Sequence, residues 1–103
     1  MIIREWRGRA LPSRAAAYPE HFTNSVVPQL RTLRGFIGAH LCRRAKGELL
    51  EFIVLTRWES FDAIRGFAGQ DFGTAVVEPG AVAALTDFDA TVQHYEVLTE
   101  VAT

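Results

Sequence analysis

The sequence is poor in several features that define whole classes of protein. Cys42 is the only cysteine, which excludes a disulfide within the chain and a cysteine-cluster metal site, and fits a reducing compartment. No apolar run approaches the ~18 residues that a membrane-spanning helix needs. Charge appears at Arg4 and Glu5, where a signal peptide would need its apolar core. We therefore expect a cytoplasmic protein with no membrane partner.

An excess of charge of one sign is also missing. The basic and acidic residues number 11 and 12, for a net charge of -1, so no global field attracts nucleic acid. Hydrophobic residues make up 49% of the chain, which is the composition of a globular protein. No repeat or flexible linker divides the sequence. We expect a single domain over residues 1–103.

The pattern of apolar residues predicts four strands and two helices. The strands are expected at residues 2–9, 36–44, 49–58 and 90–98. A stripe of large apolar side chains at helical spacing begins at Tyr18 and is interrupted by Pro19 and Pro28, so this first helix should be kinked or split. The second helix should begin after Ser60 as its cap and stop at Gly69.

The resulting order, β-α-β-β-α-β, is that of the ferredoxin-like fold, an α+β architecture with a four-stranded antiparallel sheet. Right-handed crossovers place both helices on one face of that sheet. The opposite face should carry Leu49, Ile53 and Leu55 of the third strand, an apolar surface that soluble monomers rarely expose. We therefore expect a homodimer formed through this face about a two-fold axis.

RNA-recognition domains share this element order, but their signature places stacking aromatic residues on the third strand. The nearest approach to that signature is Arg34-Gly35-Phe36 at the second strand, where Ile37 and Ala39 cannot stack on bases. Together with the missing basic excess, this argues against nucleic acid as a partner. No glycine-rich phosphate loop follows a strand, so a nucleotide cofactor is not expected.

The histidines and one tyrosine are the candidate acid-base groups. His21, His40 and His94 show none of the spacings of a metal site, so no metal is expected. His94 and Tyr95 are adjacent in the last strand, where successive side chains point to opposite faces. One of the two must face the helices, and either could be the catalytic acid-base group of a pocket. Packing with a satisfied polar tip is the alternative for both.

A substrate pocket is expected near the start of the first helix. Tyr18 and His21 lie close together there, and a kink could open a cavity between helix and sheet. Trp58, Phe22 and Phe61 complete the candidate substrate-binding set, as large aromatic side chains that the family resemblance given below would place near such a cavity. Ordinary core packing is the alternative for the aromatic members of this set.

Several short motifs in a fixed order resemble one known family. They are Gly35-Phe36-Ile37-Gly38, Thr56-Arg57-Trp58-Glu59-Ser60, Phe67-Ala68-Gly69-Gln70-Asp71 and Val92-Gln93-His94-Tyr95-Glu96-Val97. Together they resemble the antibiotic biosynthesis monooxygenase family, whose members are small dimeric α/β-barrel proteins. The resemblance implies the ferredoxin-like fold, a dimer whose two sheets face each other, and a pocket between sheet and helices.

The resemblance also implies a class of reaction. Some members oxidise polycyclic aromatic substrates with molecular oxygen and no metal or flavin, because the deprotonated substrate itself supplies the electrons. The protein supplies a base, an apolar cavity and donors for the developing negative charge. We expect a cofactor-independent monooxygenase, or a related enzyme, acting on a small hydrophobic or aromatic molecule. The alternative is a non-catalytic binding or structural dimer of the same fold.

A heme-degrading branch of this family resembles the chain in fold but uses an asparagine, a tryptophan and a histidine at set places. In this sequence those places fall at Glu5 or Trp6, near Phe67, and near Val77. The heme ligand is therefore missing, and we expect neither heme nor any other cofactor.

Overall fold

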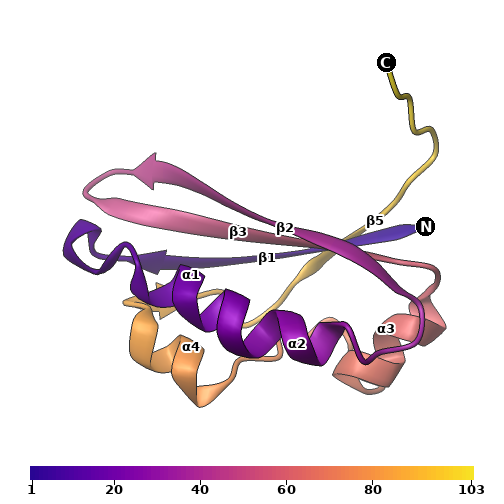
Figure 1. Ribbon diagram of the computed structural model, residues 1–103, viewed down its shortest axis with the longest axis horizontal. Helices are drawn as coiled ribbons and strands as arrows, with labels where there is room; N and C mark the ends of the chain where they lie inside the picture. Colours follow the sequence, from indigo (N-terminus) through magenta and orange to yellow (C-terminus); the bar gives the residue numbers. More distant parts are fainter.

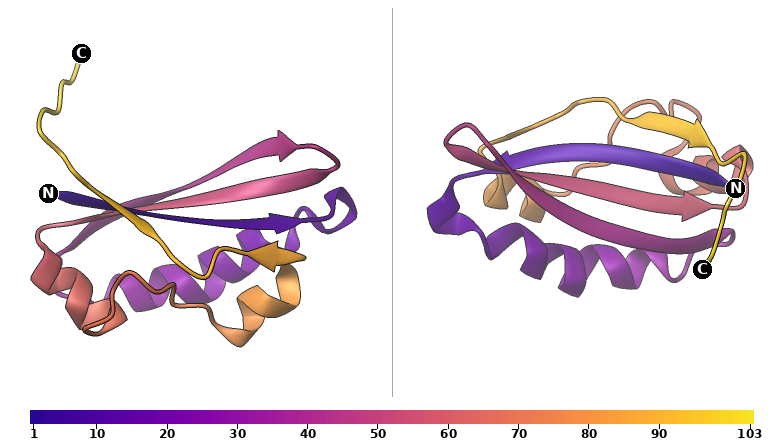
Figure 2. Two further views of the ribbon diagram at one scale, coloured as in Figure 1. Left: turned by 180° about the vertical axis from the view of Figure 1, so that it is seen from behind. Right: turned by 90° about the horizontal axis from the view of Figure 1, so that it is seen from above.

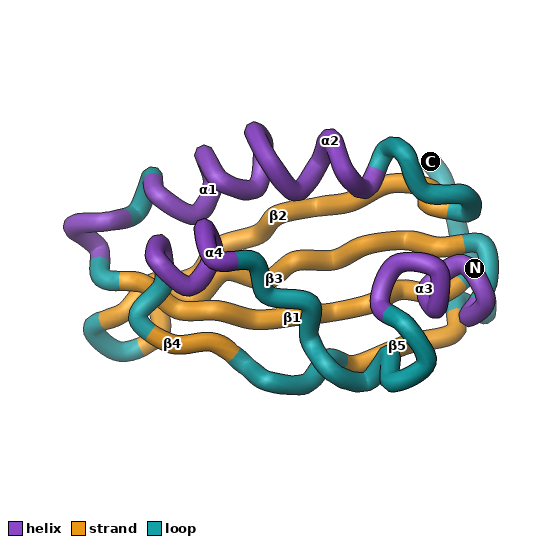
Figure 3. The backbone as a smooth tube through the Cα atoms, turned by 90° about the horizontal axis from the view of Figure 1, so that it is seen from below, coloured by secondary structure: helices purple, strands orange, loops and turns teal.

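The computed structural model describes all residues, 1–103, and its centre is one antiparallel sheet. The strands are β1 (Ile2–Ala10), β2 (Phe36–Lys46), β3 (Leu49–Trp58), β4 (Asp87–Phe88) and β5 (Gln93–Glu96). They lie in the order β2-β3-β1, and the two short strands β4 and β5 both pair with the free edge of β1. Figure 3 shows β4 and β5 following one another along that edge, so together they take the place of the expected fourth strand.

The helices all cover the same face of the sheet (Figures 1 and 2). They are a short 3-10 turn (Pro12–Arg14), α1 (Ala17–His21), a π-helical turn (Phe22–Val26), α2 (Val27–Leu30), α3 (Phe61–Ala68) and α4 (Pro79–Ala84). The ferredoxin-like α+β fold with an antiparallel sheet and one covered face is thereby confirmed. None of these helices has the length and apolar character needed to cross a membrane.

The first helix is split, as its prolines predict. Pro28 lies in the first turn of α2, directly after the π-helical turn. Proline donates no backbone hydrogen bond and its ring clashes with the preceding turn, so widening of the helix before it relieves the conflict. The apolar stripe survives this interruption, because Tyr18, Phe22 and Leu30 are all buried against the sheet.

Helix α3 begins and ends at the predicted residues. The Ser60 hydroxyl accepts a hydrogen bond from the backbone N–H of Ala63, at 3.2 Å. Gly69 ends the helix with φ of 81°, a left-handed conformation that glycine adopts at little cost. Between them the Ile64 side chain is fully buried and anchors α3 to the sheet.

The predicted last strand, 90–98, is wrong in its bounds. Between β4 and β5, the Asp89 N–H still donates to the Arg7 carbonyl of β1, but the next residues pair with the loop after α3. The Ala75 N–H donates to the carbonyl of Ala90, and the Val92 N–H to that of Gly73, each at 2.9 Å. Beyond β5 the chain makes one more backbone hydrogen bond, from Val97 to Met1, and then leaves the sheet (Figure 2). Long-range hydrogen bonds therefore shorten a strand that its β-branched composition favoured.

The open face of the sheet differs in part from the expected apolar surface. Leu49, Ile53 and Leu55 lie there and are half-buried, as predicted. Glu51 lies on the same face and is completely buried. Four cationic side chains cover its carboxylate at 2.8 to 3.3 Å, those of Arg7, Arg9, Arg44 and Lys46. This face therefore combines an apolar strip with a charged cluster.

Candidate functional site

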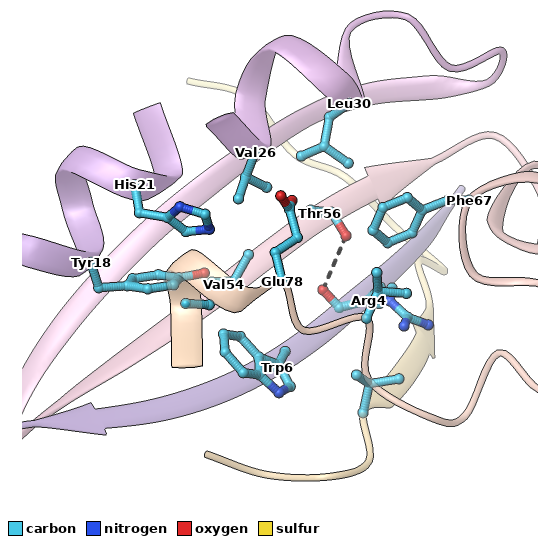
Figure 4. A pocket seen from close by; sticks show the side chains of 13 residues that line it. Arg4, Trp6, Tyr18, His21, Val26, Leu30, Val54, Thr56, Phe67 and Glu78 are labelled. Carbon is cyan, nitrogen blue, oxygen red and sulfur yellow. Dashed lines mark hydrogen bonds between the residues drawn. The ribbon is translucent and has the colours of Figure 1, made fainter. Parts of the chain in front are cut away.

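A cavity lies between the helices and the sheet face that they cover (Figure 4). Its volume is about 60 Å³, enough for a few water molecules. Strands β1 and β3 form the floor, the first helical segment forms one wall, and the segment from Val76 to Ala81 forms the other. Nine of its 13 lining residues are hydrophobic, so the few polar groups among them stand out as candidates for chemistry.

Tyr18 and His21 meet at this cavity, as the sequence predicts. Their ring centroids are 6.0 Å apart, and Figure 4 shows the Tyr18 hydroxyl directed into the cavity. Burial raises the pKa of Tyr18, and the negative charge of Glu78 raises it further. Tyr18 is therefore a neutral phenol at physiological pH, able to donate a hydrogen bond.

The imidazole of His21 is held between Tyr18 and α4. A Cβ at Gly80 would lie 2.5 Å from His21 Nδ1, so the absence of a side chain at Gly80 is what makes room for the ring. The other ring nitrogen, Nε2, is buried and has no hydrogen-bond partner. A buried polar atom without a partner is uncommon, and this one is available to a ligand or a proton.

Glu78 is a cavity residue that sequence reasoning missed. It lies just before α4 at the N-cap position, but its side chain does not cap the helix. Figure 4 shows the carboxylate turned into the cavity, and it takes part in none of the ion pairs. The Glu78-Pro79 step signals the start of a helix, but nothing in the local sequence shows that the side chain faces a cavity.

Arg4 is the second cavity residue that sequence reasoning missed. It lies on the covered face of β1 and is only 4% exposed. Its guanidinium donates to the backbone carbonyls of Phe72 and Thr74, and its Nη1 is 3.0 Å from His94 Nε2. Burial lowers the pKa of Arg4 to about 10, so it remains charged at neutral pH. The available signal was an arginine at an inward position between Ile2 and Trp6.

His94 and Tyr95 point to opposite faces of the sheet. His94 lies on the helix side, edge-on to the rings of Phe61 and Phe72, with centroids 5.7 and 5.3 Å away. It is not among the lining residues and reaches the cavity through Arg4. Burial lowers the pKa of His94, and the positive charge of Arg4 lowers it further. Tyr95 lies on the open face and is 47% exposed.

The other three predicted substrate-binding residues pack around the cavity without lining it. Trp58 is completely buried and donates from Nε1 to the Thr56 hydroxyl at 2.8 Å. Its ring stacks on Phe67, which does line the cavity, at 5.5 Å. Phe22 belongs to the hydrophobic core, and Phe61 lies beside His94.

Other parts of the molecule offer less to a hydrophobic ligand. A hollow of about 350 Å³ at the start of α3 is larger, but only two of its eight lining residues are hydrophobic. No group of three or more histidine, cysteine or acidic side chains is arranged to hold a metal ion. We therefore take the smaller cavity, where titratable groups converge on apolar walls, as the candidate site.

Comparisons with known proteins agree with this fold. The family model for antibiotic biosynthesis monooxygenase matches residues 1–78. A candidate antibiotic biosynthesis monooxygenase of Bacillus cereus has a TM-score of 0.68 at 18% identity, covering 99% of this chain and 97% of that one. Another, from Deinococcus radiodurans, has a TM-score of 0.65 at 15% identity, covering 100% of this chain and 98% of that one. No curated protein matches the chain.

A further similar structure is the heme-degrader MhuD of Mycobacterium tuberculosis with two hemes bound, which has a TM-score of 0.63 at 23% identity and covers 99% and 100%. At these identities the likeness is one of fold. A cavity of about 60 Å³ is far smaller than a heme, and Val77, near the place where the family resemblance implies a heme-ligating histidine, is aliphatic.

Proposed function

Because the chain belongs to the antibiotic biosynthesis monooxygenase family, we propose that it oxidises a small hydrophobic or aromatic molecule with molecular oxygen and without a cofactor. The observation that carries this proposal is the convergence of Tyr18, His21 and Glu78 on a cavity with mainly apolar walls. Cofactor-independent oxygenation needs a base, a neutral hydrogen-bond donor and a site that excludes water.

His21 is our candidate for the base. Its Nε2 has no partner in the protein, so it is free to take a proton from an acidic C–H or O–H group of the substrate. Glu78 lines the same cavity and would stabilise the imidazolium that forms. The neutral Tyr18 hydroxyl would donate a hydrogen bond to the substrate oxygen on which negative charge develops.

The deprotonated substrate is the reductant. For an activated CH₂ group, the carbanion gives electrons to O₂, the carbon forms a bond to one oxygen atom, and loss of water leaves a carbonyl. One oxygen atom enters the product, the other leaves as water, and all four electrons come from the substrate. The apolar walls favour this sequence, because the carbanion meets oxygen before it meets a proton from water.

The remaining predicted residues take supporting roles in this proposal. His94 positions the Arg4 guanidinium, and Trp58 supports Phe67 from behind. Phe22 and Phe61 pack behind the cavity walls. Tyr95 keeps its proposed acid-base role only for a site at the open face, formed with a second protomer.

We propose that the protein is a homodimer through the open face of the sheet. The support is the strip formed by Leu49, Ile53 and Leu55, half-buried in the single chain and suited to a second copy. Sedimentation at micromolar concentration should give twice the chain mass, and Ile53→Asp should give a folded monomer. Arg31→Asp, an exposed change on the helical side, should stay dimeric. A wild-type monomer would contradict this proposal.

Oxygen uptake with anthrone and with a naphthoquinol tests the chemistry. The wild-type protein should consume oxygen faster than buffer, and His21→Ala should lower kcat on the order of a hundredfold or more. The control is Arg31→Ala, exposed on the helical side, which should keep the wild-type rate. His94→Ala should raise KM more than it lowers kcat, and unchanged kinetics would remove His94 from the site. Wild-type rates equal to buffer would reject the oxygenase.

A non-catalytic binding protein of the same fold is the competing function. About 60 Å³ is smaller than the ~150 Å³ of an apolar cavity that accepts benzene, so an aromatic substrate must displace side chains or the segment between α3 and α4. A protein that binds such molecules tightly, but consumes no oxygen with them, would be a non-catalytic binding protein of the same fold.

A further inference from the structure

Arg4 is a buried cation without a carboxylate partner. Its three hydrogen-bond partners are two backbone carbonyls and the His94 imidazole, none of which carries a negative charge. The other arginines of β1 differ. Arg7 pairs with Glu5 and Glu51, and Arg9 pairs with three carboxylates. Arg4 is therefore the one arginine of its strand that lacks a counter-charge.

An unpaired buried charge is costly, because the interior solvates it less well than water does. The carbonyl dipoles offset only part of that cost. His94 adds no negative charge, and its Nε2 must be an unprotonated acceptor because arginine has donors only. A costly group in the wall of a cavity is readily explained by function, since sites for ligands are commonly kept at the expense of stability.

Two of the N–H donors of the Arg4 guanidinium make no hydrogen bond within the protein. Nη1 uses both of its N–H groups, on Phe72 and His94, and Nη2 uses one, on Thr74. Arginine carries five N–H donors, so one on Nη2 and the one on Nε remain for a ligand. The Nε–H and an Nη2 N–H of one guanidinium can together bind two oxygens of one anionic group.

Arg4 and the acid-base groups mark opposite ends of the cavity. Figure 4 shows Arg4 beside Thr56 and Phe67, with Tyr18 and His21 at the far end. The Arg4 Cζ atom lies 5.7 Å from the centre of the Phe67 ring, so an aromatic wall adjoins the charge. Once the cavity has widened to admit it, a flat ring between the two ends would present one edge to the guanidinium and the other to the imidazole.

The negative charge of Glu78 determines how an anionic ligand is oriented in the cavity. Its carboxylate lines the cavity without an ion-pair partner and repels a second anion from that part of the site. Arg4 attracts one. An anionic ligand therefore lies with its charge toward Arg4 and its uncharged, acidic edge toward Glu78 and His21.

We propose that Arg4 binds an anionic oxygen of the substrate, so that the natural ligands of this cavity are aromatic rings bearing a carboxylate or a phenolate. This inference rests on the proposed function, which makes the cavity the substrate site. It narrows the substrate class from hydrophobic aromatic molecules to aromatic anions. It also assigns Arg4 a second role, that of stabilising the negative charge that spreads through the ring when the proton leaves.

Paired probes of equal shape and different charge test the proposal. Benzoate and benzamide are titrated into the wild-type protein and followed by amide NMR, and 4-nitrophenolate and 4-nitroaniline form the phenolate pair. We expect each anion to bind at least about tenfold more tightly than its neutral partner. The pair with the larger ratio identifies which anionic group the site prefers. Equal affinities in both pairs, or no saturable binding of either anion, would overturn the proposal.

Variants then assign the preference to Arg4. Arg4→Gln, which is neutral but keeps donors, should bring the benzoate-to-benzamide ratio close to one, and Arg4→Lys should keep a preference for the anion. The control is Arg7→Gln, on the opposite face of the same strand, which should keep the wild-type ratio. A preserved ratio in Arg4→Gln would place the anion elsewhere.

A measurement on the wild-type protein covers the case in which Arg4→Gln does not fold. The side-chain Nε–H resonance of Arg4 should shift on addition of benzoate and stay in place with benzamide. Saturable binding of benzoate without that shift would reject Arg4 as its site. Oxygen uptake without any preference for anions would remove this inference and leave the proposed function intact. A preference for anions without oxygen uptake would leave an anion-binding site and remove the oxygenase.

Discussion

Three arginines of β1 show how one residue type takes different roles at neighbouring positions. Arg7 and Arg9 point to the open face, where carboxylates surround them. Arg4 points to the covered face, where its partners are neutral. The alternation of side chains along a strand decides which face each arginine meets. The charges around each arginine then decide whether that arginine stabilises the sheet or is available to a ligand.

His94 provides a prediction at this scale. We expect its proton to reside on Nδ1, because Nε2 accepts from Arg4, and its pKa to lie below the ordinary ~6.5, because burial and the Arg4 charge disfavour the imidazolium. The unfolded chain then binds this proton more tightly, so His94 lowers the stability of the folded protein as pH falls below ~6.5.

Imidazole ¹⁵N chemical shifts recorded against pH report both the tautomer of His94 and the pH midpoint of its protonation. The matched variant is Arg4→Gln, which removes the neighbouring charge and should raise that midpoint. A wild-type His94 protonated on Nε2, or with a pKa above the ordinary value, would contradict the assigned contact.

Among the elements, α1 and α4 meet through a residue without a side chain. Gly80 packs against the ring of His21, and a Cβ there would lie 2.5 and 2.6 Å from two ring atoms. The two helices are otherwise short, at five and six residues, and gain their stability from packing rather than from length. The position of the candidate base therefore depends on the closeness of these two helices.

Two glycine substitutions separate helix propensity from this contact. Gly66 lies inside α3 with open space around its Cα, so Gly66→Ala should stabilise the protein by about 0.5–1 kcal/mol. Gly80→Ala should not stabilise the protein, because the new Cβ would collide with the His21 ring. The displaced ring should lower both ligand affinity and kcat. Thermal unfolding and oxygen uptake measure the two effects. Equal behaviour of the two variants would show that Gly80 does not position His21.

The whole molecule has one face closed by helices and one that carries charge and apolar surface together. On the open face, burial alone would raise the pKa of Glu51, but hydrogen bonds from Arg44, Lys46 and Arg9 outweigh burial and lower it to about 2. In the unfolded chain the pKa returns to ~4.3. The folded protein therefore gains stability from this carboxylate above pH ~4.3 and loses it as pH falls toward 2.

Glu51→Gln tests this charged cluster. We expect it to lower the free energy of unfolding by about 2 kcal/mol at pH 7, a figure reduced for the half-exposed Arg44 and Lys46. The difference from wild type should shrink at pH 3 and vanish near pH 2. Chemical denaturation of both proteins at these pH values measures it. A difference that does not vary with pH would show that ionisation of Glu51 is not what stabilises the cluster.

The sequence by itself determined the order of the elements from β1 to α3 and most of their ends, but not α4 or the division of the last strand. Caps, turn glycines and periodicity act within a few residues, so Ser60, Gly69 and the split at Pro28 could be located without a structure. Tyr18 and His21 could be paired for the same reason, since they share one helical turn. The motifs from Gly35 to Val97 were enough to indicate the family.

The tertiary structure alone decided which distant groups meet. The cavity joins a strand residue, a loop residue and a helix residue: Arg4, Glu78 and His21. They meet only because the helices and the segment before α4 pack on the same face of the sheet. The broken last strand and the buried Glu51 arise in the same way, from partners at least 15 residues away or on another strand. Local pattern shows which residues can be buried, but their neighbours after burial depend on the packing of the whole chain.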